Sequence, residues 1–211
     1  MNNPWETIPL IDYEKHMSLT SVLQLQTLNE MMKSALDRYP SETLMILGVA
    51  GGNGLEHVDA RVCGRVYAVD INAEYLEACG RRYPELMGTL ETICADVSKD
   101  TCHLPQADLL LANLLIEYIG CDCFRKAVRE TAPRFVSCVI QANTDSFFVS
   151  DSPYQHIFDD LQSIHRTIDE KDLTEAMEGI GYLAELREEK ELPNGKSLVR
   201  LDFKCTDGKR K

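Results

Sequence analysis

Apolar residues follow two different patterns on either side of Pro40. Before it they recur three and four positions apart, which predicts an amphipathic helix over about residues 18–38, with apolar positions at Val22, Leu25, Leu28, Met32 and Leu36. Pro40 ends this helix, because proline disfavours helical geometry in the residue before it. The preceding arm carries Pro4 and Pro9 and is expected to be irregular, yet its apolar side chains should dock on the body of the protein.

After Pro40 the chain alternates between short apolar runs and helical stretches. The first run, residues 43–49, has no polar alternation, which is typical of a strand buried on both faces. Further strands are predicted at 65–70, 90–95, 108–112 and 135–140, and helices at 73–82 and 116–131. This order predicts an α/β fold with a doubly wound, mostly parallel sheet.

The C-terminal part has a different pattern. Residues 182–191 and 196–204 read as two strands joined by a turn containing Asn194-Gly195, a dipeptide that favours a β-hairpin. The sheet should therefore close with an antiparallel hairpin. We expect residues 1–40 to form an N-terminal arm and helix within the same domain, 41–205 the main domain, and 206–211 a tail.

Composition and charge limit the classes of molecule that the protein is expected to bind. The chain has 22 basic and 34 acidic residues among 211, a net charge of −12, which argues against nucleic acid. Its eight cysteines show no zinc-ligand spacing and are expected to be free thiols in a reducing cytosol. No signal pattern begins the chain, and no apolar run approaches the roughly 20 residues that a membrane helix needs. These features predict a cytoplasmic protein without a metal site or a membrane partner.

The candidate chemistry begins where the first strand runs into a glycine-rich turn. Four glycines fall within residues 48–54, where they allow positive φ angles and let a ligand approach the backbone. The turn is expected to open a helix whose free N–H groups face the ligand. A dinucleotide fingerprint would need a third glycine where His57 stands, so a nicotinamide-dependent oxidoreductase is the weakest alternative. Asp70 ends the second strand, where a carboxylate can bind ribose hydroxyls.

The turn resembles motif I of the class I methyltransferases that use S-adenosylmethionine. Gly52 and Gly54 match its last two glycines, whereas Gly48 and Ala50 stand where the motif has an acid and its first glycine. Residues 69–71, 95–97 and 108–118 are similar to the second, third and fourth motifs of the family, so the resemblance extends from Thr43 to Lys204. It implies S-adenosylmethionine as cofactor, held by Gly48, Val49, Ala50, Gly52, Asn53, Gly54, Asp70, Ile71, Asp96, Val97, Asn113 and Leu114.

Particular roles follow from this resemblance. Asp70 would bind the ribose, Ile71 would pack on the adenine and Asp96 would receive the adenine amino group. Because Gly48 replaces the acid, the methionine amino group must be held by backbone carbonyls or by the N-terminal arm. Replacement of Asp70 by alanine should weaken cofactor binding and leave folding nearly unaffected.

The sequence points to a small-molecule acceptor. Residues 113–116 read Asn-Leu-Leu-Ile rather than Asn-Pro-Pro-Tyr, which argues against a methyltransferase of exocyclic amines or glutamine, and the sequence has no Pro-Cys nucleophile of the kind that cytosine-C5 enzymes use. Metal-assisted enzymes of this fold place acids after the fourth and fifth strands. The residues at these places here are Asn113, Asn143 and Asp145, of which only one is an acid, so a metal-assisted site is a minor alternative. The arm resembles the lids of small-molecule methyltransferases, and the weak catalytic candidates are Tyr13, His16 and Tyr118. Residues 143–149 are expected to form the far wall of the acceptor pocket.

Two other functions remain open on these residues. A methyltransferase of protein side chains would need an open groove where a lid is expected. A non-catalytic module that binds S-adenosylmethionine or another nucleotide is compatible with the departures at Gly48 and Ala50. The oligomeric state is expected to be a monomer or a homodimer.

Overall fold

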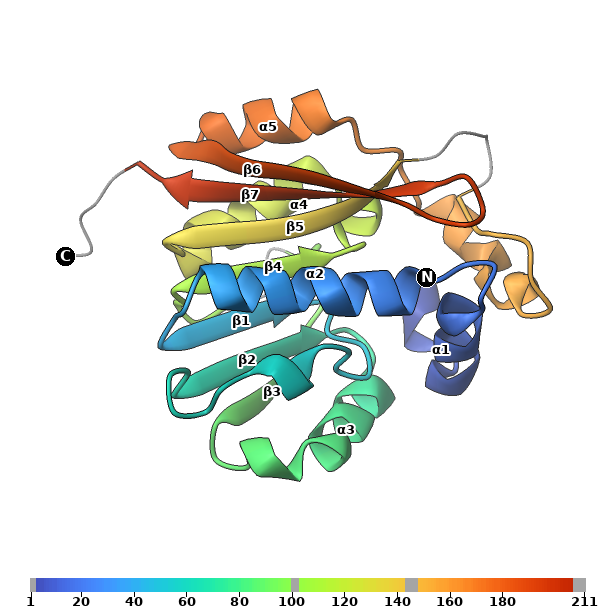
Figure 1. The fold of residues 1–211 in the computed structure, drawn as a ribbon, viewed down its shortest axis with the longest axis horizontal. Coiled ribbons are helices and arrows are strands. Elements are labelled where there is room, and N and C mark those ends of the chain that lie inside the picture. The colour runs from blue at the N-terminus through green and yellow to red at the C-terminus, as the bar shows by residue number, and fades with distance from the viewer. Residues whose placement is uncertain (1–2, 100–102, 143–147, 207–211) are drawn as a thin grey trace.

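The core of the molecule is a seven-stranded sheet in the order β3-β2-β1-β4-β5-β7-β6 (Figure 1). The computed structural model describes residues 3–99, 103–142 and 148–206. The strands are β1 (Thr43–Leu47), β2 (Arg65–Asp70), β3 (Leu90–Cys94), β4 (Leu109–Asn113), β5 (Phe135–Ala142), β6 (Tyr182–Glu191) and β7 (Ser197–Cys205). Strands β1 to β5 pair in parallel, and β7 pairs antiparallel with β5 and β6. The predicted α/β class, parallel sheet and closing hairpin are confirmed.

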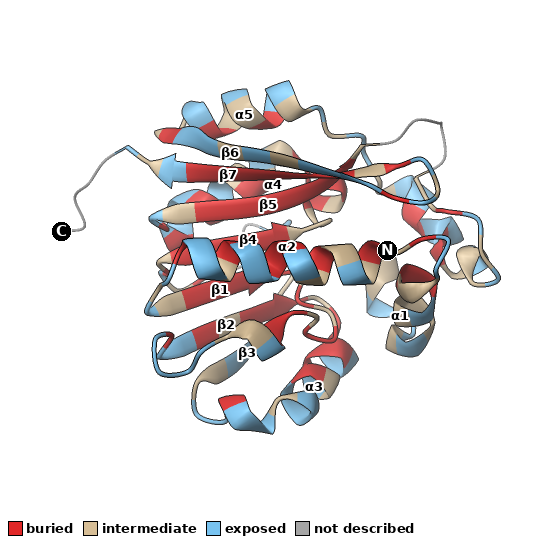
Figure 2. Ribbon diagram, in the orientation of Figure 1, coloured by how far each residue is buried: buried red, intermediate tan, exposed pale blue. Residues whose placement is uncertain are grey.

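Both faces of the sheet are covered by helices, so successive residues of a central strand pack into different cores. Leu44 and Ile46 of β1 belong to one core with α2 (Gln24–Arg38) and α3 (Ala73–Arg82). Met45 and Leu47 belong to the other, with α4 (Ile116–Thr131) and α5 (Glu170–Glu178). The central strands are therefore almost continuously buried, as Figure 2 shows, which is why they read as unbroken apolar runs.

The N-terminal segment differs from the prediction in two ways. The helix expected over residues 18–38 begins only at Gln24, because Leu23 takes a left-handed φ of 52° after a turn that contains Thr20 and Ser21. The arm expected to be irregular contains the α1 helix, Leu10–Ser18, as well as the short 3-10 turn η1, Pro4–Glu6. Proline is accommodated at both starts, within the first turn of η1 and at the N-cap of α1.

The connection from β1 to β2 is also not as predicted. The glycine turn leads into η2, a 3-10 turn of three residues (Leu55–His57), instead of opening an α-helix. The backbone reason is that Gly52 and Gly54 hold φ angles of 88° and 95°, outside the right-handed helical region. The α2 helix lies against this turn, since Asn53 Nδ2 donates to the carbonyl of Leu25 at 2.8 Å.

One ion pair lies completely inside the fold. Arg200 and Asp202 are both buried on β7, and Arg200 Nε donates to Asp202 Oδ1 at 2.8 Å. Arg200 also donates to the Ser137 hydroxyl of β5 at 3.1 Å and to the Ser34 hydroxyl of α2 at 2.9 Å. The pair thus links the hairpin, the neighbouring strand and the α2 helix.

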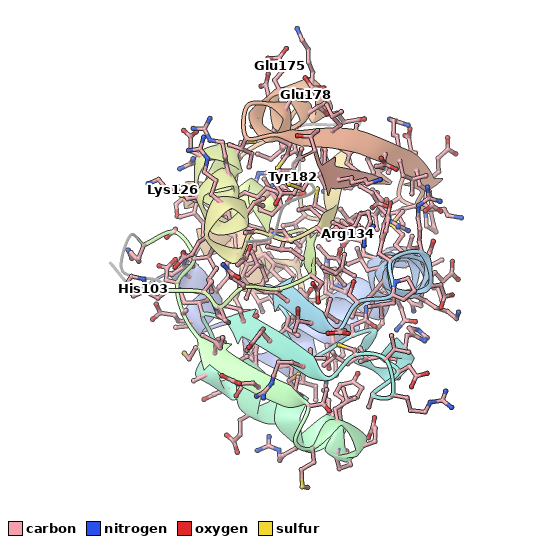
Figure 3. The ribbon with its side chains drawn as sticks, turned by 90° about the vertical axis from the view of Figure 1, so that its left-hand side faces the viewer. His103, Lys126, Arg134, Glu175, Glu178 and Tyr182 are labelled. Atoms are coloured by element: carbon pink, nitrogen blue, oxygen red, sulfur yellow. The ribbon has the colours of Figure 1, made fainter. Side chains whose placement is uncertain are left out.

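The two ends of the sheet differ in what covers them. At the carboxyl ends of the parallel strands lie α1 and the 3-10 segment η4 (Gln155–Ser163), which are side by side in Figure 1. The other end, which faces the viewer in Figure 3, carries His103, Lys126 and Arg134. Of the described helices, none is long and apolar enough to cross a membrane.

Replacing Asp202 by alanine should lower the free energy of unfolding by about 3–5 kcal/mol, because it removes the buried carboxylate that pairs with Arg200 and leaves only one described acid near it, Glu188, whose Oε2 lies 3.6 Å from Arg200 Nη1. Urea denaturation would measure this loss. The control is Asp37→Ala, which breaks an exposed pair with Lys33 and should cost at most about 1 kcal/mol. Similar small losses in both variants would contradict the assigned role of the buried pair.

Candidate functional site

A large cleft of about 1430 Å³ lies at the carboxyl ends of the parallel strands. Its floor comes from the residues that end or follow β1, β2, β3 and β4, and its other walls from the arm, α4 and η4. Ligands of open parallel sheets bind at this edge, where the strand order reverses between β1 and β4. The position of the cleft therefore makes it the candidate cofactor site.

Most of the predicted cofactor residues line this cleft, but the second half of the glycine turn does not. The cleft is lined by Gly48, Ala50, Asp70, Ile71, Asp96, Val97, Asn113 and Leu114. Gly52 and Gly54 instead pack against neighbouring helices. A Cβ on Gly52 would lie 2.6 Å from the ring of Tyr83, and one on Gly54 would lie 2.5 Å from Met32 Sδ.

Val49 and Asn53, the other two predicted residues of the turn, also point elsewhere. Val49 is buried in the core that contains α2 and α3. Asn53 accepts a hydrogen bond from Asn29 of α2 at 3.0 Å. Close packing therefore accounts for the glycines of this half, and their contact with the cofactor stays a prediction.

Asp70 organises the cleft floor. Its Oδ2 accepts from the Ala50 amide at 2.8 Å and its Oδ1 accepts from the Asn72 amide at 2.9 Å. Burial raises the pKa of Asp70, and the backbone hydrogen bonds from Asn72 and Ala50 act against that rise. Two backbone amides donate to this carboxylate, which favours a role in folding over the expectation that folding is nearly unaffected by its loss.

The backbone is strained at two places along the floor. Ala50 at the end of β1 and Leu114 at the end of β4 hold φ angles of 49° and 52°, which are uncommon for residues other than glycine. Gly48 holds φ at 70°, and a Cβ there would lie 3.3 Å from Leu115 Cδ1. An acidic side chain at position 48 would thus be strained in this conformation.

Asp96 lies at the opposite side of the floor, after β3. Its Oδ1 accepts from the Ser98 amide at 2.9 Å, and Lys99 Nζ lies 3.7 Å from its Oδ2. The carboxylate is held by its own loop and retains lone pairs that can face the cleft.

A smaller chamber of about 60 Å³ adjoins the cleft. Both cavities are lined by Trp5, Tyr13, Leu114, Tyr118 and His165, so they share a wall. The remaining chamber lining is His16, Met17, Gln24, Glu117, Gln141, Phe148, Val149 and Phe158. Aromatic rings dominate this lining. The rings of Trp5 and Tyr118 pack edge to face, with their centroids 5.0 Å apart.

The arm is fixed over these cavities by α3. Asn72 Nδ2 donates to the Trp5 carbonyl at 2.9 Å, and the Tyr75 hydroxyl donates to the Ile8 carbonyl at 2.8 Å. Glu14 of α1 pairs with Arg82, whose Nη2 donates to Glu14 Oε2 at 2.8 Å. Ile8, His16 and Met17 are buried, so the arm is part of the packed structure.

The three catalytic candidates, Tyr13, His16 and Tyr118, all line the chamber. Their shifted pKa values make each of them a poor base. His16 Nδ1 lies 2.7 Å from the Ser152 hydroxyl, and burial lowers the pKa of His16 to about 4. Burial also raises the pKa of Tyr13 and of Tyr118 well above the usual tyrosine value. Near neutral pH the imidazole is therefore neutral and both phenols keep their protons.

Sequence reasoning missed two titratable residues of the chamber, Glu117 and His165. Glu117 stands alone among apolar residues at 114–119, and a single acid in such a run is the signal that could have identified it. Of the predicted pocket wall at 143–149, Phe148 and Val149 line the chamber. Residues 143–147, including Asn143 and Asp145, lie outside the described residues.

Residues 45–133 match a family model described as a methyltransferase domain. This segment runs from β1 to the end of α4 and contains the floor of the cleft. The chain contains a methyltransferase domain. The predicted kinship with the class I enzymes is therefore confirmed for this domain, whereas the arm, η4 and the closing hairpin lie outside the match.

Solved structures share the fold of this chain at low sequence identity. Magnesium protoporphyrin IX methyltransferase (ChlM) from Synechocystis PCC 6803, with bound SAH, matches with a TM-score of 0.71 and 9% identity over 96% of each chain. Geranyl diphosphate C-methyltransferase from Streptomyces coelicolor A3(2) matches at 0.63 and 11%, over 87% of this chain and 83% of that one. The [4+2]-cyclase SpnF matches at 0.63 and 10%, over 85% and 82%. No curated protein sequence matches this chain.

Replacing Asp70 by alanine should destabilise the methyltransferase domain by about 2–4 kcal/mol, because it leaves one buried and one half-buried amide donor without an acceptor. Thermal or urea denaturation without ligand would measure this effect. Glu91→Ala, which removes an exposed partner of Arg65, is the control and should change stability by less than about 1 kcal/mol. An unchanged unfolding curve for Asp70→Ala would show that its carboxylate does not hold the turn.

Proposed function

We propose that this protein transfers the methyl group of S-adenosylmethionine to a small-molecule acceptor. The observation that carries the proposal is the junction of the two cavities. The cleft contains Asp70, Ile71, Asp96 and Val97, which match the second and third family motifs. The chamber adjoins it at Tyr13, Leu114 and Tyr118. Two ligands bound in these cavities would meet at that shared wall.

The residues of the cleft fit the cofactor. Its volume of about 1430 Å³ is ample for a nucleoside with an amino-acid extension. Asp96 and Val97 would hold the adenine and Asp70 the ribose. The arm segment Asn3–Thr7 and Tyr13 complete the wall where the methionine end needs contacts that Gly48 cannot give. The bound cofactor would supply an electrophilic methyl group on a positively charged sulfur.

The protein's own contribution is alignment and exclusion of water. Direct displacement at a methyl group requires the acceptor atom to approach in line, and a fixed geometry supplies much of the rate enhancement. The arm and η4 cover the strand ends, and their apolar residues Ile8, Phe158 and Leu161 form a cluster of their own. This cover would keep bulk water from the reacting atoms.

A small acceptor fits this enclosure better than a protein side chain or a nucleic acid. The chamber holds about 60 Å³ and lies beneath the arm, whereas a folded protein substrate would need an open groove. The net charge of −12 opposes a polyanion. The names of two structural neighbours, which refer to magnesium protoporphyrin IX and geranyl diphosphate, are in keeping with a small molecule.

A second candidate function is a protein that binds the cofactor without transferring its methyl group. The missing acid at Gly48 favours it, and the cyclase among the structural neighbours shows that this fold also serves another chemistry. The two functions differ in one measurement. Both require cofactor binding, but only the first produces S-adenosylhomocysteine when an acceptor is present.

S-Adenosylhomocysteine should raise the melting temperature, because a ligand that binds only the folded state stabilises it by mass action. At a concentration 100 times its Kd the gain is about 2.7 kcal/mol, or roughly 5–10 °C for a chain of this size. Differential scanning fluorimetry would measure the shift, with NAD as the control ligand. No shift at millimolar S-adenosylhomocysteine would contradict both candidate functions.

The arm should become more resistant to proteolysis when the cofactor product is bound, because Asn3–Thr7 and Tyr13 would then contact the ligand. Limited trypsin digestion can follow cleavage after Lys15 on α1 with and without S-adenosylhomocysteine. Cleavage after Arg61, whose side chain is 90% exposed, is the internal control and should not change. Equal cleavage after Lys15 in both conditions would make the arm a permanent packing element.

A further inference from the structure

The chamber contains one buried carboxylate that the fold does not fully satisfy. Glu117 is 3% exposed, and its Oε1 accepts from the Gln141 amide at 2.8 Å. Its Oε2 is buried and has no hydrogen-bond partner among the described residues. Buried polar atoms are nearly always paired in folded proteins, so an orphaned oxygen in a cavity wall calls for a partner from a ligand.

The same carboxylate is costly to ionise without such a ligand. Burial raises the pKa of Glu117 to about 7, and the hydrogen bond from the Gln141 backbone acts against the rise. An ionised Glu117 is therefore present near neutral pH at a cost in stability that a cation beside it would offset.

The other titratable groups that face the chamber do not provide that cation. Burial lowers the pKa of His16 and of His165, the latter also through the nearby charge of Lys196. Tyr13 and Tyr118 keep their protons, because burial raises the pKa of each. No lysine or arginine is among the described residues that line the chamber. Among these lining residues an anionic acceptor would therefore meet the carboxylate of Glu117 and no positively charged side chain.

The aromatic lining is suited to a small cation. Trp5, Tyr13, Tyr118, Phe148 and Phe158 surround the space beside Glu117. The faces of such rings attract ammonium groups, by about 2 kcal/mol or more when water is excluded. A carboxylate and several aromatic rings around about 60 Å³ match a head group of a few heavy atoms that carries positive charge.

We propose that the acceptor is a small amine whose nitrogen docks on Oε2 of Glu117, and that Glu117 is both a specificity-determining and a catalytic residue. This inference rests on the proposed methyltransferase function. It commits that function to N-methylation, with the amine head group in the chamber and the remainder of the acceptor extending into the cleft.

The proton and electron balance of the step is simple. The ammonium form of the acceptor donates one proton to the Glu117 carboxylate and becomes a neutral amine with a free lone pair. That lone pair forms the new N–C bond while the C–S bond breaks, and the sulfur keeps the bonding electrons. The products are the methylated ammonium ion and neutral S-adenosylhomocysteine, with the first proton held on Glu117.

The test compares three probes of similar size on the protein saturated with S-adenosylhomocysteine: propylamine, propanol and propionate. We expect propylamine to bind at least ten times more tightly than the other two in a calorimetric or NMR titration. Glu117→Gln, which keeps the shape and removes the charge, should lose at least tenfold in propylamine affinity. The control is Glu178→Gln. Glu178 lies on α5, is labelled in Figure 3 and does not line the chamber, so this variant should bind propylamine like the wild type.

A pH series separates a charge effect from a structural one. Propylamine affinity of the wild type should fall as the pH drops below about 7, where Glu117 takes up a proton, and Glu117→Gln should show no such step. The folded state of Glu117→Gln can be checked independently. Because the raised pKa makes the wild-type carboxylate destabilising as pH rises from 4.5 through about 7, the variant should melt no lower than the wild type at pH 8.

Each outcome has a definite meaning. Equal affinity for the three probes, preference for propionate or propanol, no propylamine binding by the wild type, or undiminished propylamine binding by Glu117→Gln would overturn the inference. S-Adenosylhomocysteine should bind Glu117→Gln within threefold of the wild type, since Glu117 lines the chamber and not the cleft. Failure of the wild type to bind S-adenosylhomocysteine would instead overturn the proposed function itself.

Discussion

The ligand-binding edge of this protein depends on a single carboxylate at the end of β2. Asp70 accepts from the Ala50 amide on one side and from the Asn72 amide on the other, which joins the glycine turn to the start of α3. Asn72 in turn caps α3 by accepting from the amides of Glu74 and Tyr75, and it donates to the carbonyl of Trp5. The floor of the cleft and its cover are thus fixed to the same two residues.

The sheet could be predicted because its physical causes are local to the sequence. The run at 43–47 is apolar throughout since both faces of β1 are covered, and the Asn194-Gly195 turn marks the hairpin that closes the sheet. The strand ends then follow from topology. Asp70, Asp96 and Asn113 could be placed at one edge without coordinates because parallel strands end on the same side.

The rest depended on packing between segments far apart in the chain. Gly52 and Gly54 are predicted as ligand contacts, and the structure adds that a side chain at either position would collide with Tyr83 or Met32, which no local pattern reveals. Prolines disfavour the interior of a helix, so the sequence predicts an irregular arm. In the structure both Pro4 and Pro9 stand at positions where a helix can begin. The sequence does not single out Glu117 as a site residue. Its second carboxylate oxygen is buried without a hydrogen-bond partner among the described residues, and only the packed structure shows this.

The walls of the chamber have mixed origins. Leu114, Glu117 and Tyr118 belong to the matched methyltransferase domain, whereas Trp5, His16 and Phe158 come from segments outside it. Substitutions in the arm or η4 can therefore reshape the acceptor space while the strand ends stay unchanged. Under the proposed function, acceptor choice and nucleotide binding can therefore change separately in such a chain. Proteins with the same acceptor are thus better sought by their arm and their 148–165 segment than by their glycine turn.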